Sequence, residues 1–184
     1  MKSVRAEINK TMPIIGEKVI LNNITLHDLV KVRLCCNREG FEKFTSRPVY
    51  KLKEEDSYNV YSKVIKDDRI CILGIYEKSE GTIMGYITIY DYNDRNKAIE
   101  IGYYLIEAYR NKGYMKETVN LTLKILFHKL KLNKVTAQTG SYNDSSNALL
   151  KSCGFKLDGV LRQHHELHGK LYDDYLYSIL NEEF

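Results

Sequence analysis

Three segments rich in Ile and Tyr follow one another between residues 69 and 106, and they limit the possible folds more than any other feature. They are 69–76 (RICILGIY), 82–92 (TIMGYITIYDY) and 97–106 (KAIEIGYYLI). Only the polar turns 78–81 and 93–96 separate them. Aromatic and β-branched residues favour strands, and turns this short join antiparallel neighbours. The sequence therefore predicts an antiparallel meander of three strands.

Strand and helix patterns surround this meander on both sides. Before it, we expect a strand at 18–22 and helices at 25–36 and 54–65. After it, apolar spacing predicts a helix from 115 to before 133, a strand at 134–139, a helix at 143–153 and strands at 155–167 and 170–180. The order β-α-α-β-β-β-α-β-α-β-β predicts an α/β (α+β) protein. We expect a mixed, mostly antiparallel central sheet of about seven strands with helices on its faces.

Composition narrows the class of protein. The chain has 184 residues, 43% of them apolar, and no linker or repeat divides it, so we expect one domain over residues 1–184. No apolar run approaches the ~18 residues of a membrane helix, and the charged N-terminus does not resemble a secretory signal. We therefore expect a cytoplasmic protein that makes no membrane contact.

Charge and cysteine content argue against two further classes of function. The net charge is +4, with both signs interspersed, so a nucleic-acid partner is not expected. The most basic stretch, 124–134, alternates with Leu and Phe and resembles the solvated face of a helix. The four cysteines form no C-x-x-C pair, and we expect no metal site.

A short basic loop, Arg110-Asn111-Lys112-Gly113-Tyr114-Met115, joins the third meander strand to the long helix. Free N–H groups at a helix start attract anions, and Gly113 allows a phosphate to approach the backbone closely. Arg110, Lys112 and Lys116 add positive charge. The loop is too short for a P-loop, so one pyrophosphate is the expected ligand. A capped helix behind a solvated basic turn is the alternative.

Several ordered motifs resemble those of the GNAT superfamily of N-acetyltransferases. The strand–R-x-x-G-x-[G/A]–helix pattern is similar to its motif A, with Arg110, Gly113 and Met115 at the three positions; Met115 departs from the usual Gly or Ala. The segments 143–148 (NDSSNA) and 153–155 (CGF) resemble its "N…S-N-A…GF" pattern. The stretch 158–174 resembles the closing motif of the RimJ/RimL-like branch, which acetylates protein N-termini.

This resemblance implies a GNAT fold and acetyl-CoA as co-substrate. Backbone N–H groups of residues 111–115 then bind the pyrophosphate, in an opening where the strand 97–106 diverges from the strand 134–139. The pantetheine pairs with backbone near Leu105 and Ile106, and an N–H near Ile106 stabilises the oxyanion. The residues implied to contact the cofactor are Leu105, Ile106, Arg110, Asn111, Lys112, Gly113, Tyr114, Met115, Lys116, Asn143 and Lys151.

Glu100 is the candidate general base. Alternation along its strand puts Glu100, Gly102 and Tyr104 on one face and Ile99, Ile101, Tyr103 and Leu105 on the other. A carboxylate among apolar neighbours is costly unless it is paired, solvated or useful. It could take a proton from an ammonium group directly or through one water. A Glu bonded to a neighbouring strand is the alternative, and the family resemblance favours the base.

Ser146 is the candidate partner of the leaving thiolate. Many GNAT enzymes use a tyrosine on this helix, but the matching position here is Leu150. In the RimL-like branch, which this sequence resembles, a serine has that role, and Ser146 falls at its position. A neutral serine is a weak acid, so we expect it to donate a hydrogen bond to sulfur. Helix capping is the alternative role.

The remaining polar residues suggest less. In the segment 163–168 (QHHELH), strand alternation separates His165 from His164 and His168, which makes a poor metal cage. Cys153 resembles a buried small apolar residue more than a nucleophile. Tyr103, Tyr104 and Tyr142 are candidates for the wall of the acceptor tunnel.

The acceptor amine is the least determined part of the reading. By branch resemblance we expect a protein or peptide N-terminus, attacking acetyl-CoA directly in a ternary complex. Polyamines or aminoglycoside-type amines are the second choice, and residues 22–68 are expected to contribute to the acceptor site. A catalytically silent CoA-binding module and a nucleic-acid binder using 124–134 stay open, as does a homodimer.

Overall fold

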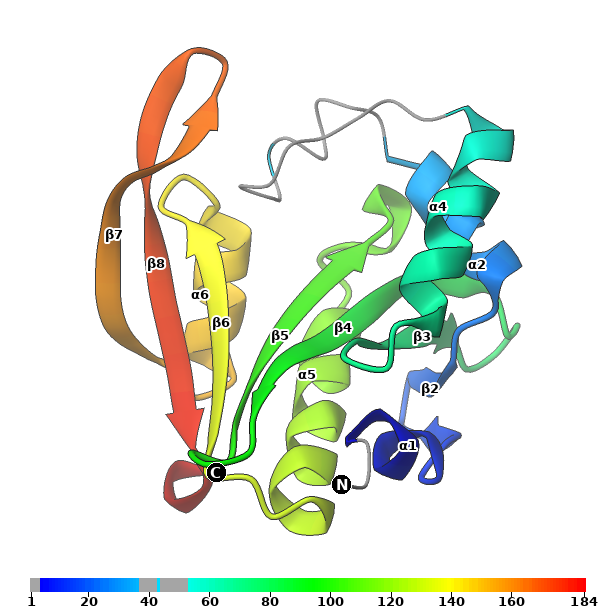
Figure 1. Ribbon diagram of the computed structural model, residues 1–184, viewed down its shortest axis with the longest axis horizontal. Helices are drawn as coiled ribbons and strands as arrows, with labels where there is room; N and C mark the ends of the chain where they lie inside the picture. The colour runs from blue at the N-terminus through cyan, green and yellow to red at the C-terminus, as the bar shows by residue number, and fades with distance from the viewer. Residues whose placement is uncertain (1–3, 37–42, 44–52) are drawn as a thin grey trace.

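The structure is a computed structural model that describes residues 4–36, 43 and 53–184 (Figure 1). The described helices are α1 (Val4–Asn9), α2 (Leu26–Leu34), α4 (Glu54–Lys66), α5 (Tyr114–Lys124) and α6 (Asp144–Ser152). The described strands are β1 (Ile14–Ile15), β2 (Val19–Asn23), β3 (Cys71–Glu77), β4 (Ile83–Asn93), β5 (Ala98–Leu105), β6 (Lys134–Gly140), β7 (Lys156–Leu167) and β8 (Lys170–Leu180).

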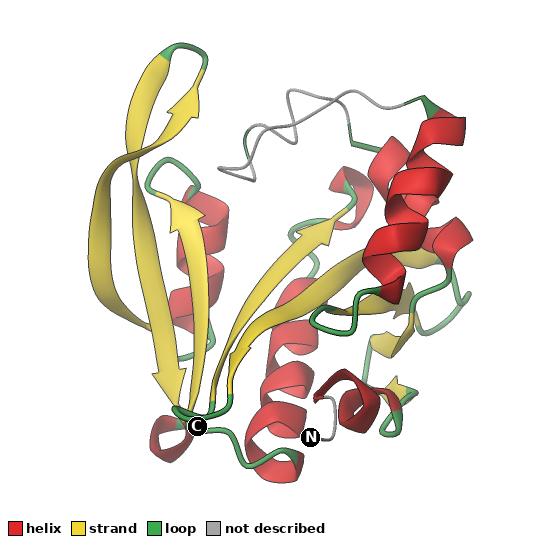
Figure 2. Ribbon diagram, viewed as in Figure 1, coloured by secondary structure: helices red, strands yellow, loops and turns green. Residues whose placement is uncertain are grey.

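These strands form one eight-stranded sheet in the order β1-β2-β3-β4-β5-β6-β8-β7 (Figure 2). All neighbouring strands are antiparallel except β5 and β6, which are parallel. The predicted meander is confirmed as β3, β4 and β5. The expectation of about seven strands missed β1, a two-residue strand paired with β2, and it also missed α1. Elements this short carry no measurable hydrophobic period.

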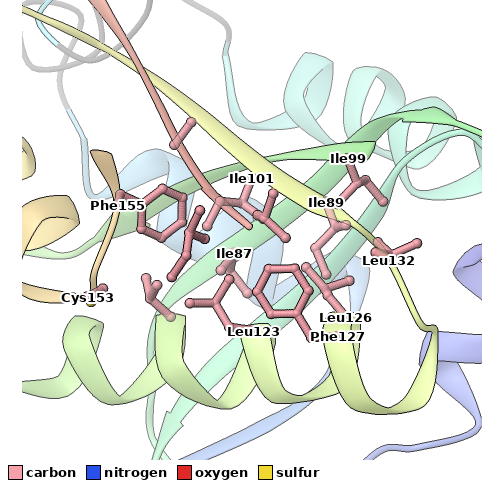
Figure 3. Packing of buried hydrophobic residues seen from close by; sticks show 14 of the residues in the cluster. Ile87, Ile89, Ile99, Ile101, Leu123, Leu126, Phe127, Leu132, Cys153 and Phe155 are labelled. Carbon is pink, nitrogen blue, oxygen red and sulfur yellow. The ribbon is translucent and has the colours of Figure 1, made fainter. Parts of the chain in front are cut away.

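Two apolar layers cover the two faces of the sheet. On one face, α5 and α6 pack on Ile99, Ile101 and Phe155 (Figure 3). On the other face, α2 and α4 pack around Tyr104 and Ile83. The predicted alternation along β5 is therefore confirmed, since odd-numbered residues face α5 and α6 while Tyr104 faces α2 and α4.

The sheet opens between its two parallel strands, as expected. β5 pairs with β6 only from Ala98↔Lys134 to Glu100↔Thr136. Beyond that point β5 continues along β4 as far as Gly85↔Leu105, and β6 continues along β8 as far as Gly140↔Asp174. Figure 1 shows the two strands diverging. We call the space between residues 101–105 and 137–140 the β5–β6 opening.

The long helix ends differently from its prediction. α5 stops at Lys124 and passes into a π-helical turn at Ile125–Lys129. Ile125, Leu126 and Phe127 are buried there, whereas Lys124 and Lys129 are exposed. The basic stretch is thus the solvated side of a buried turn, as its pattern indicates.

Candidate active site

The basic loop stands at the start of α5 with its backbone in unusual conformations. Asn111 has φ +61° and Gly113 has φ +84°, both in the left-handed region. Gly113 is the N-cap residue, and the first helical bond runs from the N–H of Glu117 to its carbonyl at 3.1 Å. The N–H groups of the first helical turn before Glu117 have no carbonyl partner within the helix. This geometry is the one expected of an anion site, and anion binding here stays a prediction.

Lys18 brings a further cation to this loop, and sequence reasoning missed it. Its Nζ lies 3.4 Å from the carbonyl oxygen of Lys112 and 3.6 Å from where a Cβ on Gly113 would stand. The carboxylate of Glu117 accepts hydrogen bonds from the backbone N–H groups of Glu17 and Lys18, which holds the β1–β2 turn against α5. Lys18 and Lys112 are 94 residues apart, so no local pattern could have linked them.

The basic side chains of the loop point in different directions. Arg110 donates from Nε to the carbonyl oxygen of Leu105 at 3.0 Å, and its guanidinium lies 5.6 Å from the ring centre of Tyr104. Arg110 therefore stands at the edge of the β5–β6 opening. Lys112 lies over the ring of Tyr109 at 5.8 Å, and Lys116 is exposed. Charge from Lys112, Lys116 and Lys18 surrounds the loop.

The backbone of β5 offers hydrogen-bonding groups to the opening. The N–H of Ile106 donates to the carbonyl of Met84 at 2.9 Å, so it is already used inside the sheet. Backbone groups alternate in direction along a strand, so those of Tyr103 and Leu105 point away from β4. The expected oxyanion donor near Ile106 therefore moves to the N–H of Leu105, because the Ile106 N–H belongs to the β4 pairing.

Glu100 is the last residue of β5 that pairs with β6, and its side chain is half-buried. Its Oε1 accepts a hydrogen bond from the hydroxyl of Tyr90 at 2.6 Å. Among the described residues, no hydrogen bond to its other oxygen is made. The cross-strand bond that was the alternative to a base is therefore present, and it uses one of the two carboxylate oxygens.

The N-terminus of α6 reaches the same opening from the other side. Asn143 caps the helix, and its Oδ1 accepts from the N–H of Ser146 at 3.3 Å. The Oγ of Ser146 lies 2.8 Å from the hydroxyl oxygen of Tyr103. Burial raises the pKa of Tyr103, while the hydrogen bond with Ser146, in which either oxygen can donate, offsets part of that rise. Ser146 is therefore both a first-turn helix residue and a partner of a buried phenol.

Asn147 is a second residue that sequence reasoning did not select. Its Nδ2 donates to the carbonyls of Gly140 at 3.3 Å and Ser141 at 3.4 Å. Its buried Oδ1 has no hydrogen-bond partner among the described residues. A buried acceptor without a donor is costly, so this atom is suited to a ligand N–H. Lys151, by contrast, lies exposed in the last turn of α6.

The candidate catalytic residues lie on opposite faces of the sheet. Glu100 shares its face with Tyr104, under α2 and α4. Tyr103 and its partner Ser146 lie toward α5 and α6. As alternation predicts, Tyr103 therefore lies on the opposite side of the sheet from Tyr104, and the place of either ring in an acceptor tunnel stays a prediction.

A buried polar cluster closes the far end of β6 on the Glu100 face. The hydroxyl of Tyr142 lies 2.7 Å from Nε2 of His165 and donates to the carbonyl of Lys43 at 2.8 Å. Nδ1 of His165 lies 3.4 Å from Oδ1 of Asp174, and Gln138 donates to its Oδ2 at 2.7 Å. Burial, with Asp174 nearby, raises the pKa of Tyr142. A β-bulge between Leu161 and His165 helps to turn His165 inward.

The other histidines and Cys153 match their predictions. His164 and His168 are exposed, whereas His165 is 3% exposed. Within the described ranges, no three His, Cys, Asp or Glu side chains are grouped in a way that could hold a metal ion. Cys153 is buried in the main apolar cluster, and burial raises the pKa of its thiol. A thiol held in its neutral form is a poor nucleophile.

Comparison with known proteins supports the same reading. The family described as "Acetyltransferase (GNAT) domain" matches residues 18–156. The chain is 27% identical to the "Probable N-acetyltransferase YjcK" of Bacillus subtilis, over 80% of this chain and 84% of that protein. It is 24% identical to the "Ribosomal-protein-serine acetyltransferase" of Escherichia coli, over 79% and 82% of the two chains.

Solved structures share the fold. A GNAT-family acetyltransferase from Bacillus anthracis superimposes with a TM-score of 0.78 at 25% identity, covering 94% of this chain and all of that one. Spermidine N-acetyltransferase from Vibrio cholerae, solved with CoA and spermine, gives 0.81 at 18% identity and covers 91% and 98%. In the part of the chain that is described, no helix is long and apolar enough to cross a membrane. With its family match extending over β2 to β6 and the basic loop before α5, the chain belongs to the GNAT acetyltransferase family and is an N-acetyltransferase.

Proposed function

We propose that this enzyme moves the acetyl group of acetyl-CoA to the free α-amine of a protein or peptide, by direct attack in a ternary complex. The observation that carries the proposal is the β5–β6 opening. It has the cation-rich start of α5 at its mouth, Glu100 where the strands part, and the N-terminus of α6 on its other side.

Acetyl-CoA suits the groups at the mouth. The first-turn N–H groups of α5 and the left-handed backbone at Asn111 and Gly113 suit its pyrophosphate, with Lys18 and Lys112 adding charge. The carbonyl of Leu105, and the Oδ1 of Asn147 that has no partner among the described residues, suit the amide N–H groups of the pantetheine arm. Asn143 then acts mainly by capping α6, rather than by binding the cofactor directly.

Glu100 is the proposed general base for the acceptor amine. The acceptor enters on the face of Glu100 and Tyr104, while the thioester approaches from the α5 side. Tyr90 orients the carboxylate through one oxygen, which leaves the other to take the ammonium proton directly or through a water. The amine then attacks the acetyl carbon, and the N–H of Leu105 stabilises the oxyanion. Holding amine and thioester together supplies much of the rate.

A protein N-terminus suits the charges on this face better than a polyamine does. Among the described residues of this face, each of three carboxylates already has partners: Glu100 accepts from Tyr90, Asp174 lies against His165 and Gln138, and Asp28 accepts from Thr25 and Tyr76. Arg33 contributes a positive charge close by, donating to the hydroxyls of Tyr61 and Tyr86. A polycation would need several uncompensated carboxylates, whereas a peptide brings a single amine.

The test is a comparison of acceptors in one assay. Release of CoA thiol is measured with a panel of peptides that differ in their first residue, with the same peptides blocked at the α-amine, and with spermidine. The proposal predicts turnover with free N-termini that is lost on blocking. A kcat/KM for spermidine tenfold above that of the best peptide would contradict it.

Polyamine acetylation is the second candidate function. The observation that favours it is the likeness in fold to the Vibrio cholerae enzyme solved with spermine. At 18% identity that likeness concerns the fold, so we rank this candidate below the peptide acceptor.

A further inference from the structure

The hydroxyl of Tyr103 contacts the hydroxyl of Ser146 across the β5–β6 opening. Tyr103 belongs to β5 and packs against the main apolar cluster, and Ser146 belongs to the first turn of α6. Their oxygens are 2.8 Å apart, although 43 residues separate them in the sequence. The hydroxyl of Ser146 is not needed to cap α6, because Asn143 already accepts the hydrogen bond from the backbone N–H of Ser146.

The chemistry of the two hydroxyls sets the direction of the bond. A phenol is the more acidic group and hence the better donor, and burial raises the pKa of Tyr103 so that it keeps its proton. Each hydroxyl has one hydrogen to donate and two lone pairs that accept. When Tyr103 donates to Ser146, the single hydrogen of Ser146 remains available for a third atom.

We propose that Tyr103 is a positioning residue, which donates to Ser146 so that Ser146 donates its own hydrogen to the departing sulfur of CoA. This inference rests on the proposed function, because it assumes that the thioester lies beside Ser146. It also accounts for the absence of a tyrosine at Leu150, which is fully buried in the apolar cluster. The phenol comes from β5 instead, and acts through the serine.

The step balances without a further reactant. The amine nitrogen bonds to the acetyl carbon, the carbon–sulfur bond breaks, and its electron pair goes to sulfur. Glu100 takes one proton from the ammonium before attack, and the second proton that the nitrogen loses as the amide forms passes through water to the thiolate. Consecutive hydrogen bonds polarise one another, so the bond from Tyr103 strengthens the one that Ser146 gives to the thiolate. The partial positive charge at the N-terminus of α6 also stabilises the negative charge on the thiolate.

A double-mutant cycle tests the coupling. The variants are Tyr103→Phe, Ser146→Ala and the two combined, with Tyr175→Phe as the matched control. Tyr175 packs against the same apolar cluster from β8, so its loss reports on packing alone. We expect each single variant to lower kcat about tenfold, with the KM for acetyl-CoA within about twofold of wild type. The double variant should match Ser146→Ala alone, because Tyr103 acts only through Ser146.

The second measurement needs no acceptor. CoA bound to each variant is titrated with base, and the ultraviolet absorbance of the thiolate reports the pKa of the bound thiol. Loss of a donor to sulfur should raise that pKa by about one unit in either single variant, and by no more in the double variant. The Tyr175→Phe control should leave it unchanged.

Three results would overturn the proposal. They are equal effects of Tyr103→Phe with and without Ser146, an unchanged thiol pKa in Tyr103→Phe, and an effect of Tyr175→Phe as large as that of Tyr103→Phe. If wild type acetylates none of the amines tried, the proposed acceptor is wrong. The thiol titration then still decides whether Tyr103 and Ser146 act on sulfur.

Discussion

Replacing Glu100 with Gln is the sharpest test of the amine half of the site. The amide has the shape of the carboxylate and can still accept the hydrogen bond that Tyr90 now gives to Oε1. Glu100 is only partly buried and Gln carries no charge, so no buried charge is left unpaired and the free energy of unfolding should change by no more than about 0.5 kcal/mol. The variant therefore removes the base and little else.

The expected loss follows from what a general base supplies. Removal of one typically lowers the rate by ~100-fold, which at about 1.4 kcal/mol per tenfold is about 2.7 kcal/mol of transition-state free energy. The loss should depend on pH, because a peptide α-amine has a pKa of about 7.7–8.0. Above that pH the acceptor is already neutral, so the ratio of wild-type to variant rates should fall toward one.

Steady-state release of CoA thiol, measured from about pH 6.5 to 9.5 with one saturating peptide, gives this ratio directly. Glu107→Gln is the matched control, since Glu107 is an exposed glutamate just beyond the same strand. A loss of less than about tenfold near neutral pH would refute the assignment, as would a ratio that does not change with pH.

Three further perturbations probe the loop and the buried cluster. Gly113→Ala must keep φ +84°, which costs a residue with a Cβ about 1–2 kcal/mol, so the KM for acetyl-CoA should rise roughly tenfold at unchanged kcat; an unchanged KM would contradict this. Lys18→Met should weaken acetyl-CoA binding in calorimetry at low salt, with the deficit shrinking at high salt; a salt-independent deficit would point to misfolding of the turn instead. His165→Asn removes the partner of the buried Asp174 carboxylate and should lower the free energy of unfolding, measured in urea, by about 3 kcal/mol. The exposed control His164→Asn should lower it by only about 0.5 kcal/mol. Equal losses would show that the His165–Asp174 contact does not stabilise the fold.

Much of the fold can be predicted from short stretches of sequence. The strand 97–106 and the helix that follows Arg110 were predicted within a residue or so of β5 and the start of α5. Alternation also assigned Glu100 to the correct face, and the helix at 143–153 was predicted within a residue or so of α6. Each of these features depends on neighbours within one turn or strand. The extent of the domain and the catalytic roles of Glu100 and Ser146 stay predictions.

Other features depend on residues that only the folded chain brings together. The hydrogen-bonding partners of Tyr103, Arg110 and Ile106 were not predicted, and neither was the approach of Lys18 to the loop. A residue pattern states which side chains share a face, but not which atom across the sheet each one meets. Arg110 shows the limit well, because its place in the motif suggested a phosphate partner while its Nε donates to Leu105.

The chain therefore encodes its strands, helices and turns locally, through the period of apolar residues and the conformational demands of residues such as Gly113. The active site arises at a higher level. β5 and β6 part after Glu100↔Thr136, and this parting brings the basic start of α5, a carboxylate and a serine to one opening. Their contacts join residues separated by tens of positions, and such contacts exist only after the apolar faces of the sheet have been buried.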